Sequence, residues 1–386
     1  MRIGIDARTL TLSEIRGIGT YLLEVLNAWP KSSKKDTFIL FVEERSFPKL
    51  PSNQKIKFEV KKIKSPRGTR FRIWEWYALP KAIKQYSLDI FWSPANIAFP
   101  IINPIQIVTI HDTLLQEYVQ FDSLFEKVYF RKIIPFFTRN YVRHIITVSS
   151  FSANRINYIF SYPKEHITII YNGIPDIQKK FSSKKEAQNF LARENIVKPP
   201  YIYALGAESP WKNTKVLLEA FQKVQSKISN ISLIISGIQS RSINIFKNLS
   251  QKFNLNESRV KLLEFIPNEL KYILYQGAEI FIYPSLFEGF GFPPLEAMAL
   301  GVPVIASNAA SIPEVVGEAA LLIDARYPNN ITEAIVKILT NEELKFKLVK
   351  LGFENVKRFD WHKSATEHCI LFKKSFELNS NTKNEF

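Results

Sequence analysis

Residues 285–307 read SLFEGFGFPPLEAMALGVPVIAS, and the residues that lead into them, EIFIYPS, form an apolar run typical of a buried strand. The pattern PPLEAMAL predicts a helix with proline in its first turn, where the missing N–H of proline has no partner to lose. Two carboxylates, Glu288 and Glu296, lie on either side of a glycine-containing turn. The stretch therefore predicts a strand, a loop and a helix, with one carboxylate in the loop and one in the helix.

The glycines and carboxylates of this stretch suggest what it binds. Gly289 and Gly291 carry no side chain, so the loop backbone can approach a ligand closely. Amides at the start of a helix favour an anion, whereas the two carboxylates repel one. We therefore expect the carboxylates to bind hydroxyl groups beside an anion, as in a ligand made of ribose, diphosphate and sugar.

The same succession of strand and helix repeats along the whole chain, in two series. Many candidate strands are apolar on consecutive residues, as expected for strands covered on both faces, and their alternation with helices predicts parallel sheets. The candidates are MRIGID, TFILFV, KFEVKKI, DIFWSP, IVTIHD, HIITVSS and ITIIYNG in the first half, and YIYALG, ISLIISG, RVKLLEFI, EIFIYPS, VPVIAS and ALLID in the second. The prediction is an α/β protein with two doubly wound, Rossmann-like domains.

The chain has 386 residues, which is long for one core and sufficient for two. We predict an N-terminal domain over 1–175, joined by a C-terminal helix over 360–378, and a second domain over 201–359. The polar segment 176–200, which ends in KPP, is predicted as a linker that carries a helix. Ligands of such folds bind beyond the carboxyl ends of the strands, so we expect the site in a cleft between two facing domains.

Composition limits the other possibilities. The single cysteine, Cys369, excludes an intrachain disulfide and a cysteine metal cluster, and it favours a cytoplasmic protein. No apolar run is long enough to span a membrane, and MRIGIDARTL is a strand pattern rather than a signal peptide. The net charge of +16 indicates an anionic partner, such as a nucleotide, nucleic acid or an acidic membrane, or simply a solvated basic surface. No block of consecutive basic residues marks a nucleic-acid arm, so we expect no nucleic-acid partner.

The string EGFGFPPLEAMALGVPVIAS resembles the signature of the retaining glycosyltransferases of family 4, which have the GT-B fold. The likeness continues through SIPEVVGEAALLID and covers nearly the whole chain. It includes RGIGTY, WEWYALP, DIFWSP, TIHDTLL, TVSSFS, IYNG, ALGAESPWKN and a late tryptophan, Trp361. The resemblance implies two facing Rossmann-like domains, with a nucleotide-sugar donor in the interdomain cleft and a glycan or lipid-linked glycan as acceptor.

The resemblance also implies roles for individual residues of the second domain. Glu296 would bind the ribose hydroxyls, and Glu288 would lie near the donor sugar and its departing phosphate. Without the resemblance, Glu296 could be a first-turn carboxylate that the helix dipole favours, and Glu288 a solvated loop residue. The other donor-binding candidates are the main-chain groups of Gly289, Phe290, Gly291 and Phe292, and those of Phe265 and Ile266 beside the nucleobase.

The loop ALGAESPWKN contains the second charged candidate. Lys212 is expected to open an amphipathic helix, where an ammonium is unfavourable unless an anion binds there. The resemblance implies that Lys212 binds the diphosphate, usually with the help of an arginine. Here Trp211 precedes the lysine and no arginine lies between Gly206 and Lys212, which leaves Lys212 as the main cation of this loop. A solvated surface lysine is the alternative.

Three candidates of the first domain follow predicted strands. His111 and Asp112 end a buried strand, and the resemblance implies that His111 contacts the donor sugar and helps to stabilise positive character at its anomeric carbon. Asp112 would orient the loop, and Asn96 would face the acceptor. The alternatives are a structural histidine and an asparagine that only forms a turn.

The segment RGIGTY follows the first predicted strand. Gly17 and Gly19 are expected to form a tight loop before the helix TYLLEVLNAW. The resemblance implies that this loop lies against the donor phosphates and the acceptor. Two glycines before a helix can also be only a turn. Arg16 could supply the cation that is missing beside Trp211.

The reaction implied by the resemblance moves a sugar from a nucleotide diphosphate to a hydroxyl with retention, and the departing phosphate takes the acceptor's proton. His111, Glu288 and Lys212 are the catalytic candidates, and GDP-mannose is the favoured donor. No metal is expected, because the chain lacks an Asp-any-Asp triplet. No cofactor is expected either. The alternatives are an epimerase, hydrolase or phosphorylase of the same form, or a non-catalytic basic binding protein. The basic segment 125–145 could dock on the cytoplasmic face of an anionic membrane, or it could be an ordinary helix of the first domain.

Overall fold

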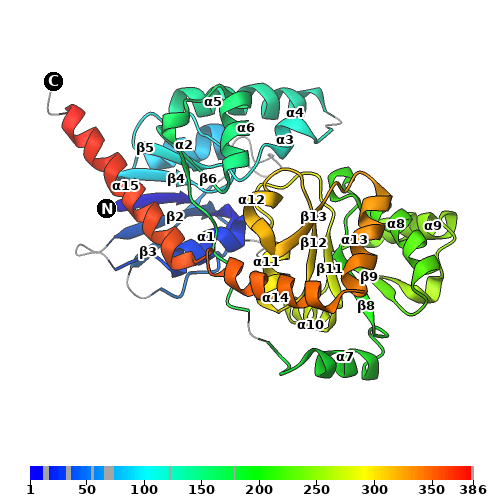
Figure 1. Ribbon diagram of the computed structural model, residues 1–386. Helices are drawn as coiled ribbons and strands as arrows, with labels where there is room; N and C mark the ends of the chain where they lie inside the picture. Colours follow the sequence, from blue (N-terminus) through cyan, green and yellow to red (C-terminus); the bar gives the residue numbers. More distant parts are fainter. Residues whose placement is uncertain are drawn as a thin grey trace. The chain divides into compact units, whose positions relative to one another are not determined.

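The computed structural model describes residues 1–11, 17–31, 36–53, 56–64, 74–120, 123–177 and 179–383. It divides into two compact units (Figure 1). The first contains Met1–Gly173 and the residues from Phe359 onward, and the second is Ile174–Arg358. The segment 176–200, which the sequence predicts as a linker, belongs to the second unit, because its helix packs against a helix of that unit.

The first unit has a seven-stranded parallel sheet with the order β3-β2-β1-β4-β5-β6-β7. All seven strands predicted in the first half of the chain are present. The strands are β1 (Arg2–Asp6), β2 (Thr37–Glu43), β3 (Lys57–Ile63), β4 (Ile90–Ser93), β5 (Ile105–Thr109), β6 (His144–Thr147) and β7 (Ile167–Ile169). The helices are α1 (Ile18–Asn27), α2 (Leu79–Ile83), α3 (Leu114–Glu117), α4 (Leu124–Val128), α5 (Ile134–Tyr141), α6 (Ser150–Phe160) and α15 (Trp361–Lys383), with the short turns η1 (Arg8–Leu10) and η4 (Lys164–His166) and the π-helical segments η2 (Trp74–Ala78) and η3 (Tyr129–Ile133).

The second unit has a six-stranded parallel sheet with the order β10-β9-β8-β11-β12-β13. The six strands predicted in the second half are present as β8 (Tyr201–Leu205), β9 (Ser232–Ser236), β10 (Val260–Leu262), β11 (Ile280–Tyr283), β12 (Val304–Ser307) and β13 (Ala320–Ile323). The helices are α7 (Lys184–Arg193), α8 (Thr214–Lys227), α9 (Ile243–Lys252), α10 (Asn268–Gly277), α11 (Phe292–Ala299), α12 (Ile312–Val316), α13 (Pro328–Leu339) and α14 (Glu342–Val356), with the short turns η5 (Pro210–Lys212), η6 (Ser240–Ser242), η7 (Glu257–Arg259) and η8 (Gly317–Ala319).

Both sheets confirm the predicted doubly wound class. Their central strands are buried along their whole length, as β4 and β11 show, which explains why their sequences are apolar on consecutive residues. In each sheet the strand order reverses beside the first strand of the unit, at β1–β4 and at β8–β11. Doubly wound sheets bind ligands at the carboxyl ends of the strands beside such a reversal.

The C-terminal helix α15 is part of the first unit. A chain of buried hydrogen bonds attaches it to the sheet: Trp92 Nε1 donates to Thr109 Oγ1 (2.9 Å), Tyr21 bonds Thr109 Oγ1 (3.1 Å), and His368 Nε2 is 2.6 Å from the Tyr21 hydroxyl. His368 Nδ1 donates to the carbonyl oxygen of Ser364 at 2.7 Å. In a neutral imidazole only one nitrogen carries a proton, so with that proton on Nδ1 the Nε2 nitrogen accepts from the Tyr21 hydroxyl.

Burial lowers the pKa of His368 to about 4, against 6.5 for an unperturbed histidine. Between these two pH values the unfolded chain binds a proton at His368 that the folded chain excludes. The contribution of His368 to the free energy of unfolding is therefore fully present above about pH 6.5 and is lost as the pH decreases toward 4. We expect His368 to contribute a loss of about 1.4 kcal/mol per pH unit in this window. Urea unfolding at several pH values should therefore show a shallower pH dependence for His368→Gln than for the wild type. Equal slopes would contradict the assignment.

Candidate functional site

The loops that follow β8 and β11 lie side by side at the reversal of the second sheet, because these two strands are hydrogen-bonded neighbours. Their backbones are joined directly, since the amide of Leu286 donates to the carbonyl oxygen of Trp211 at 2.7 Å. The side-chain amide of Asn213 donates to the carbonyl oxygens of Pro284 (3.3 Å) and Ala325 (2.6 Å). The two loops therefore form one hydrogen-bonded frame.

The sequence predicts that Lys212 opens the following helix, but the structure places this residue before the helix. It ends η5, and α8 begins two residues later at Thr214. Between them Asn213 has φ +59°, a left-handed conformation that asparagine tolerates better than most residues. This turn directs the lysine toward the loop that follows β11.

Lys212 and Glu288, two of the predicted catalytic residues, are ion-paired. Lys212 Nζ donates to Glu288 Oε1 at 2.6 Å, and the hydroxyl of Ser285 donates to the same oxygen at 2.6 Å. The Lys212 side chain is 29% exposed and that of Glu288 is 17% exposed, so the pair is partly shielded but reachable. The ammonium has three N–H groups, so it can keep Glu288 and still donate to another oxygen.

The loop from Glu288 to Phe292 is held by Ser311, a buried residue that precedes α12. The Ser311 hydroxyl lies 2.8 Å from the carbonyl oxygen of Glu288 and 2.9 Å from that of Phe290. Gly291 has φ +112°, which an L-residue with a side chain rarely adopts. Pro293 and Pro294 follow in the first turn of α11 and carry no N–H, so the helix start offers an anion few amides and the ammonium of Lys212 gains importance.

Glu296 lies in α11 and is only 6% exposed. Its Oε1 accepts from Lys271 Nζ of α10 at 2.9 Å. Beside it is a cluster of buried rings: Tyr275 packs edge to face on Tyr203, with centroids 5.0 Å apart. Burial, with the nearby Glu296 carboxylate, raises the pKa of Tyr275, which keeps its hydroxyl protonated. Both signature carboxylates therefore have a lysine partner, contributed by a different element in each case.

Phe265 and Ile266 lie in the loop between β10 and α10, just before the helix that carries Lys271. The Phe265 side chain is 54% exposed, and Ile266 is half-buried. The start of this loop is held by the bond from the Gly237 amide to the carbonyl oxygen of Glu264 (3.1 Å). The loop is thus adjacent in sequence to the element that contacts Glu296.

In the first unit, His111 follows β5 and its position is set by main-chain and side-chain bonds. Asn96 has φ +60°, and its Oδ1 accepts from the His111 amide at 2.7 Å. The Asn96 side chain therefore holds His111 in place, and its positive φ agrees with the alternative that this residue forms a turn. The acceptor contact of Asn96 stays a prediction. Asp112 Oδ1 accepts from the Leu114 amide at 2.9 Å and so orders the start of α3, in line with its predicted role in the loop.

The imidazole of His111 is fixed in one neutral form. Its Nε2 lies 2.9 Å from the carbonyl oxygen of Pro94, which can only accept, so Nε2 carries the proton and Nδ1 is the acceptor nitrogen. Burial lowers the pKa of His111 to about 4. At neutral pH this side chain therefore carries no positive charge.

The predicted loop before the first helix is shorter than expected. α1 begins at Ile18, so Gly19 lies inside its first turn, and Gly17 is the residue before the helix, with φ +51°. The Tyr21 amide donates to the Gly17 carbonyl oxygen at 3.0 Å and closes this turn. Arg16 lies outside the described residues.

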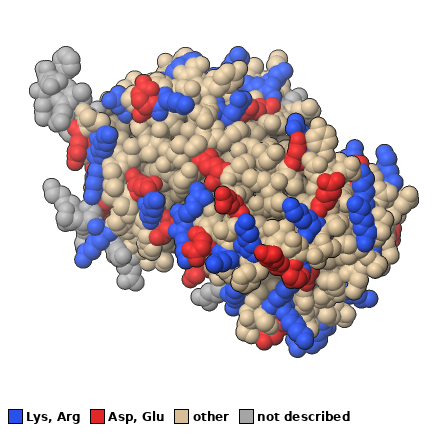
Figure 2. Space-filling model, in the orientation of Figure 1, with Lys and Arg blue, Asp and Glu red and all other residues tan. Residues whose placement is uncertain are grey.

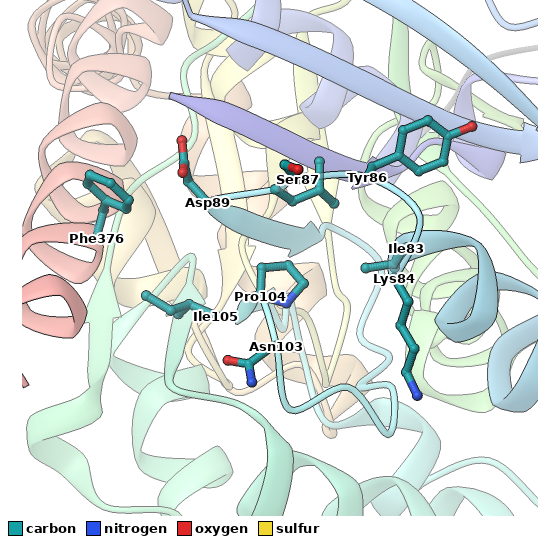
Figure 3. Close-up of a pocket in the computed structure, with 10 residues that line it drawn as sticks. Ile83, Lys84, Tyr86, Ser87, Asp89, Asn103, Pro104, Ile105 and Phe376 are labelled. Carbon is teal, nitrogen blue, oxygen red and sulfur yellow. The ribbon is translucent and has the colours of Figure 1, made fainter. Parts of the chain in front are cut away.

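A separate hollow of about 330 Å³ lies in the first unit at the amino ends of β4 and β5, whereas His111 follows the carboxyl end of β5 (Figure 3). Lys84, Asp89, Asn103, Ile105 and Phe376 are among its lining residues, whereas the predicted site residues that the structure describes are not. Within the described ranges, no group of three His, Cys, Asp or Glu side chains could hold a metal ion. No helix in the same ranges combines the length and the apolar character needed to cross a bilayer.

Both halves of the chain match models of glycosyltransferase families. Residues 15–176 match the model described as Glycosyltransferase Family 4, and residues 186–354 match the model described as Glycosyl transferases group 1. The second match contains Lys212, Lys271, Glu288 and Glu296, and the first contains His111.

Two curated relatives resemble the chain in sequence. The O-antigen chain mannosyltransferase B of Escherichia coli is 32% identical over 232 residues, which are 59% of this chain and 60% of that protein. The O-antigen chain mannosyltransferase RfbU of Salmonella typhimurium is 31% identical over 257 residues, which are 66% of this chain and 67% of the relative. Among solved structures, sucrose-phosphate synthase from Thermosynechococcus elongatus matches with a TM-score of 0.73 and 18% identity, covering 98% of this chain and 99% of the other, which shows a shared fold.

Proposed function

Because this chain belongs to glycosyltransferase family 4 and has its two-domain GT-B architecture, we propose that it is a retaining hexosyltransferase. It moves a hexose from a nucleotide-diphosphate sugar to a hydroxyl group of a glycan or lipid-linked glycan. The observation that supports this most is the pairing of both signature carboxylates with lysines within one doubly wound sheet. Lys212 and Glu288 follow the neighbouring strands β8 and β11, and Lys271 of α10 pairs with Glu296 of α11.

Lys212 is the residue that we assign to the leaving group. As the bond between the anomeric carbon and the diphosphate breaks, negative charge grows on the phosphate, and an ammonium already held in place stabilises it. Glu288 holds that ammonium, and in this scheme it also accepts a hydroxyl of the sugar. Glu296 accepts the ribose hydroxyls, because a carboxylate only accepts hydrogen bonds at neutral pH.

His111 acts on the sugar without a charge of its own. Its Nδ1 lone pair can accept a hydroxyl hydrogen of the donor sugar, and its neutral ring does not repel the oxocarbenium-like carbon. The acceptor's proton passes to an oxygen of the departing phosphate while the new glycosidic bond forms on the same face. No side chain has to act as a general base, and no metal ion is needed in this scheme.

GDP-mannose is the proposed donor, because the two curated relatives are mannosyltransferases. We expect GDP-mannose to raise the Tm of the protein in EDTA, in proportion to the logarithm of its concentration over its Kd. UDP-glucose, UDP-N-acetylglucosamine and dTDP-rhamnose serve as the comparison. Stabilisation by another of these donors would refute mannose while the family reaction stands, and stabilisation only after added Mg²⁺ or Mn²⁺ would refute metal independence.

An epimerase or hydrolase of the same form would convert the donor without an acceptor. The two classes separate when nucleotide release is followed with and without a glycan acceptor. Release that depends on acceptor, with the sugar recovered on the glycan in α linkage from an α donor, supports transfer with retention. A free or epimerised sugar formed at the same rate without acceptor would favour the alternative.

A further inference from the structure

The first unit exposes an unusual number of large apolar side chains on two segments that are distant in sequence. Trp76 and Tyr77 in η2 are 37% and 63% exposed. The continuous helix formed by α4, η3 and α5 exposes four more, namely Leu124 (76%), Phe125 (46%), Val128 (41%) and Phe136 (49%). We call these six residues the aromatic face. Six exposed large apolar side chains on adjoining elements indicate an interaction surface rather than scattered exposure.

Ring contacts show that the two segments form one surface. The Trp76 ring lies 6.4 Å from that of Phe125 and 6.3 Å from that of Phe137, between centroids. Tyr129 lies beneath, buried, with its ring 5.8 Å from that of Trp76. The sequence pattern of the helix alone does not reveal this, because Trp76 precedes it by about fifty residues.

Basic side chains surround the aromatic face. Residues 124–143 contain five basic residues and one acidic residue, Glu126, a local net charge of +4. Lys127, Lys132 and Arg139 are exposed there, and Lys81 of α2 lies over the Tyr77 ring at 5.5 Å. Figure 2 shows lysine and arginine side chains among uncharged surface over the region of α4 and α5.

Apolar and basic side chains are mixed along one face of the helix formed by α4, η3 and α5. Leu124, Val128, Lys132 and Phe136 follow one another at steps of four, and all four are exposed. Apolar side chains interleaved with lysine and arginine match a surface that is hydrocarbon beneath and anionic at its boundary. Tryptophan and tyrosine are the side chains that prefer this boundary.

We propose that the aromatic face docks onto the surface of an anionic lipid bilayer. Leu124, Phe125 and Phe136 enter the headgroup region, Trp76 and Tyr77 lie at its boundary, and the surrounding lysines and arginine contact lipid phosphates. The proposal does not depend on the proposed transfer reaction, since it concerns binding by a surface whose residues do not include the candidate site. A protein partner for this face is the competing occupant.

Tryptophan fluorescence can test the contact directly. All six tryptophans are described, and Trp76 alone is exposed, since four others are buried and Trp211 is half-buried. Phosphatidylcholine vesicles with about one third phosphatidylglycerol should shift the emission of the full chain to the blue, and pure phosphatidylcholine should not. Trp76→Phe should remove the shift and leave flotation with the vesicles intact.

Two sets of variants separate specific docking from the general basic charge. Lys127→Gln, Lys132→Gln and Arg139→Gln together should weaken vesicle binding by about fivefold per charge removed. The matched control changes three exposed lysines of the second unit, Lys227, Lys247 and Lys252, to glutamine and should bind like the wild type. Leu124→Ser with Phe136→Ser should also weaken binding, whereas Phe346→Ser, at another residue 74% exposed, should not.

The thermal stability of each variant shows that it is folded before its binding is compared. An equal loss of vesicle binding in the variant of the aromatic face and in the control variant of the second unit would overturn the proposal, because binding would then depend on net charge alone. No binding to anionic vesicles, or equal binding to neutral ones, would also overturn it and leave a protein partner as the occupant of this face.

Discussion

Lys212→Ala is expected to lower the kcat of glycosyl transfer about 100- to 1000-fold, the usual effect of removing one group that stabilises transition-state charge. The loss should be this large because η5 positions a single lysine in this loop, Trp211 occupies the position before it, and the prolines of α11 reduce the number of amides that face an anion. Rapid-quench measurement of product formation with saturating donor isolates this step from binding.

Lys215→Ala is the matched control, because Lys215 lies in the first turn of α8 and is exposed. Lys212→Arg keeps the charge and should recover part of the rate. Removal of Lys212 also leaves the Glu288 carboxylate without its cation, so the variant's Tm should be measured as well. A kcat within a few-fold of the wild type would show that another group balances the phosphate charge.

Glu296→Ala is expected to weaken donor binding roughly 10- to 100-fold, because it removes a charged acceptor of hydroxyl groups. The same change leaves the ammonium of Lys271, whose side chain is only 18% exposed, without its partner. Titration calorimetry with the nucleoside diphosphate and with the nucleoside monophosphate checks this prediction. Both ligands should lose affinity by a similar factor, since the proposed contact is to the ribose.

A double-mutant cycle separates the two effects. If Lys271 acts only by positioning Glu296, then Lys271→Ala should weaken donor binding in the wild type. The same change should have almost no effect on donor affinity when Glu296→Ala is already present. Glu343→Ala, an exposed carboxylate of α14, is the control. Unchanged affinity in Glu296→Ala would remove this residue from the donor site.

The candidate site shows how far sequence patterns extend. Glu288 and Glu296 could be found because they flank a glycine turn between a predicted strand and a predicted helix. Lys271 could not, because a lysine in an ordinary amphipathic helix has no local signal, and its pairing with Glu296 joins residues 25 positions apart. Ser311 and Asn213 were missed for the same reason, since their hydrogen bonds connect separate loops.

The sequence by itself determined the α/β class, thirteen strands and the membership of both sheets, because strand and helix periodicities are local properties of a few adjacent residues. Only the tertiary structure decided that α7 belongs to the second unit, that Asn96 holds His111, and that Trp76 adjoins the helix of α4 and α5. Each of these depends on contacts between residues far apart in the chain, whose geometry emerges only when the sheets bring their loops and helices together.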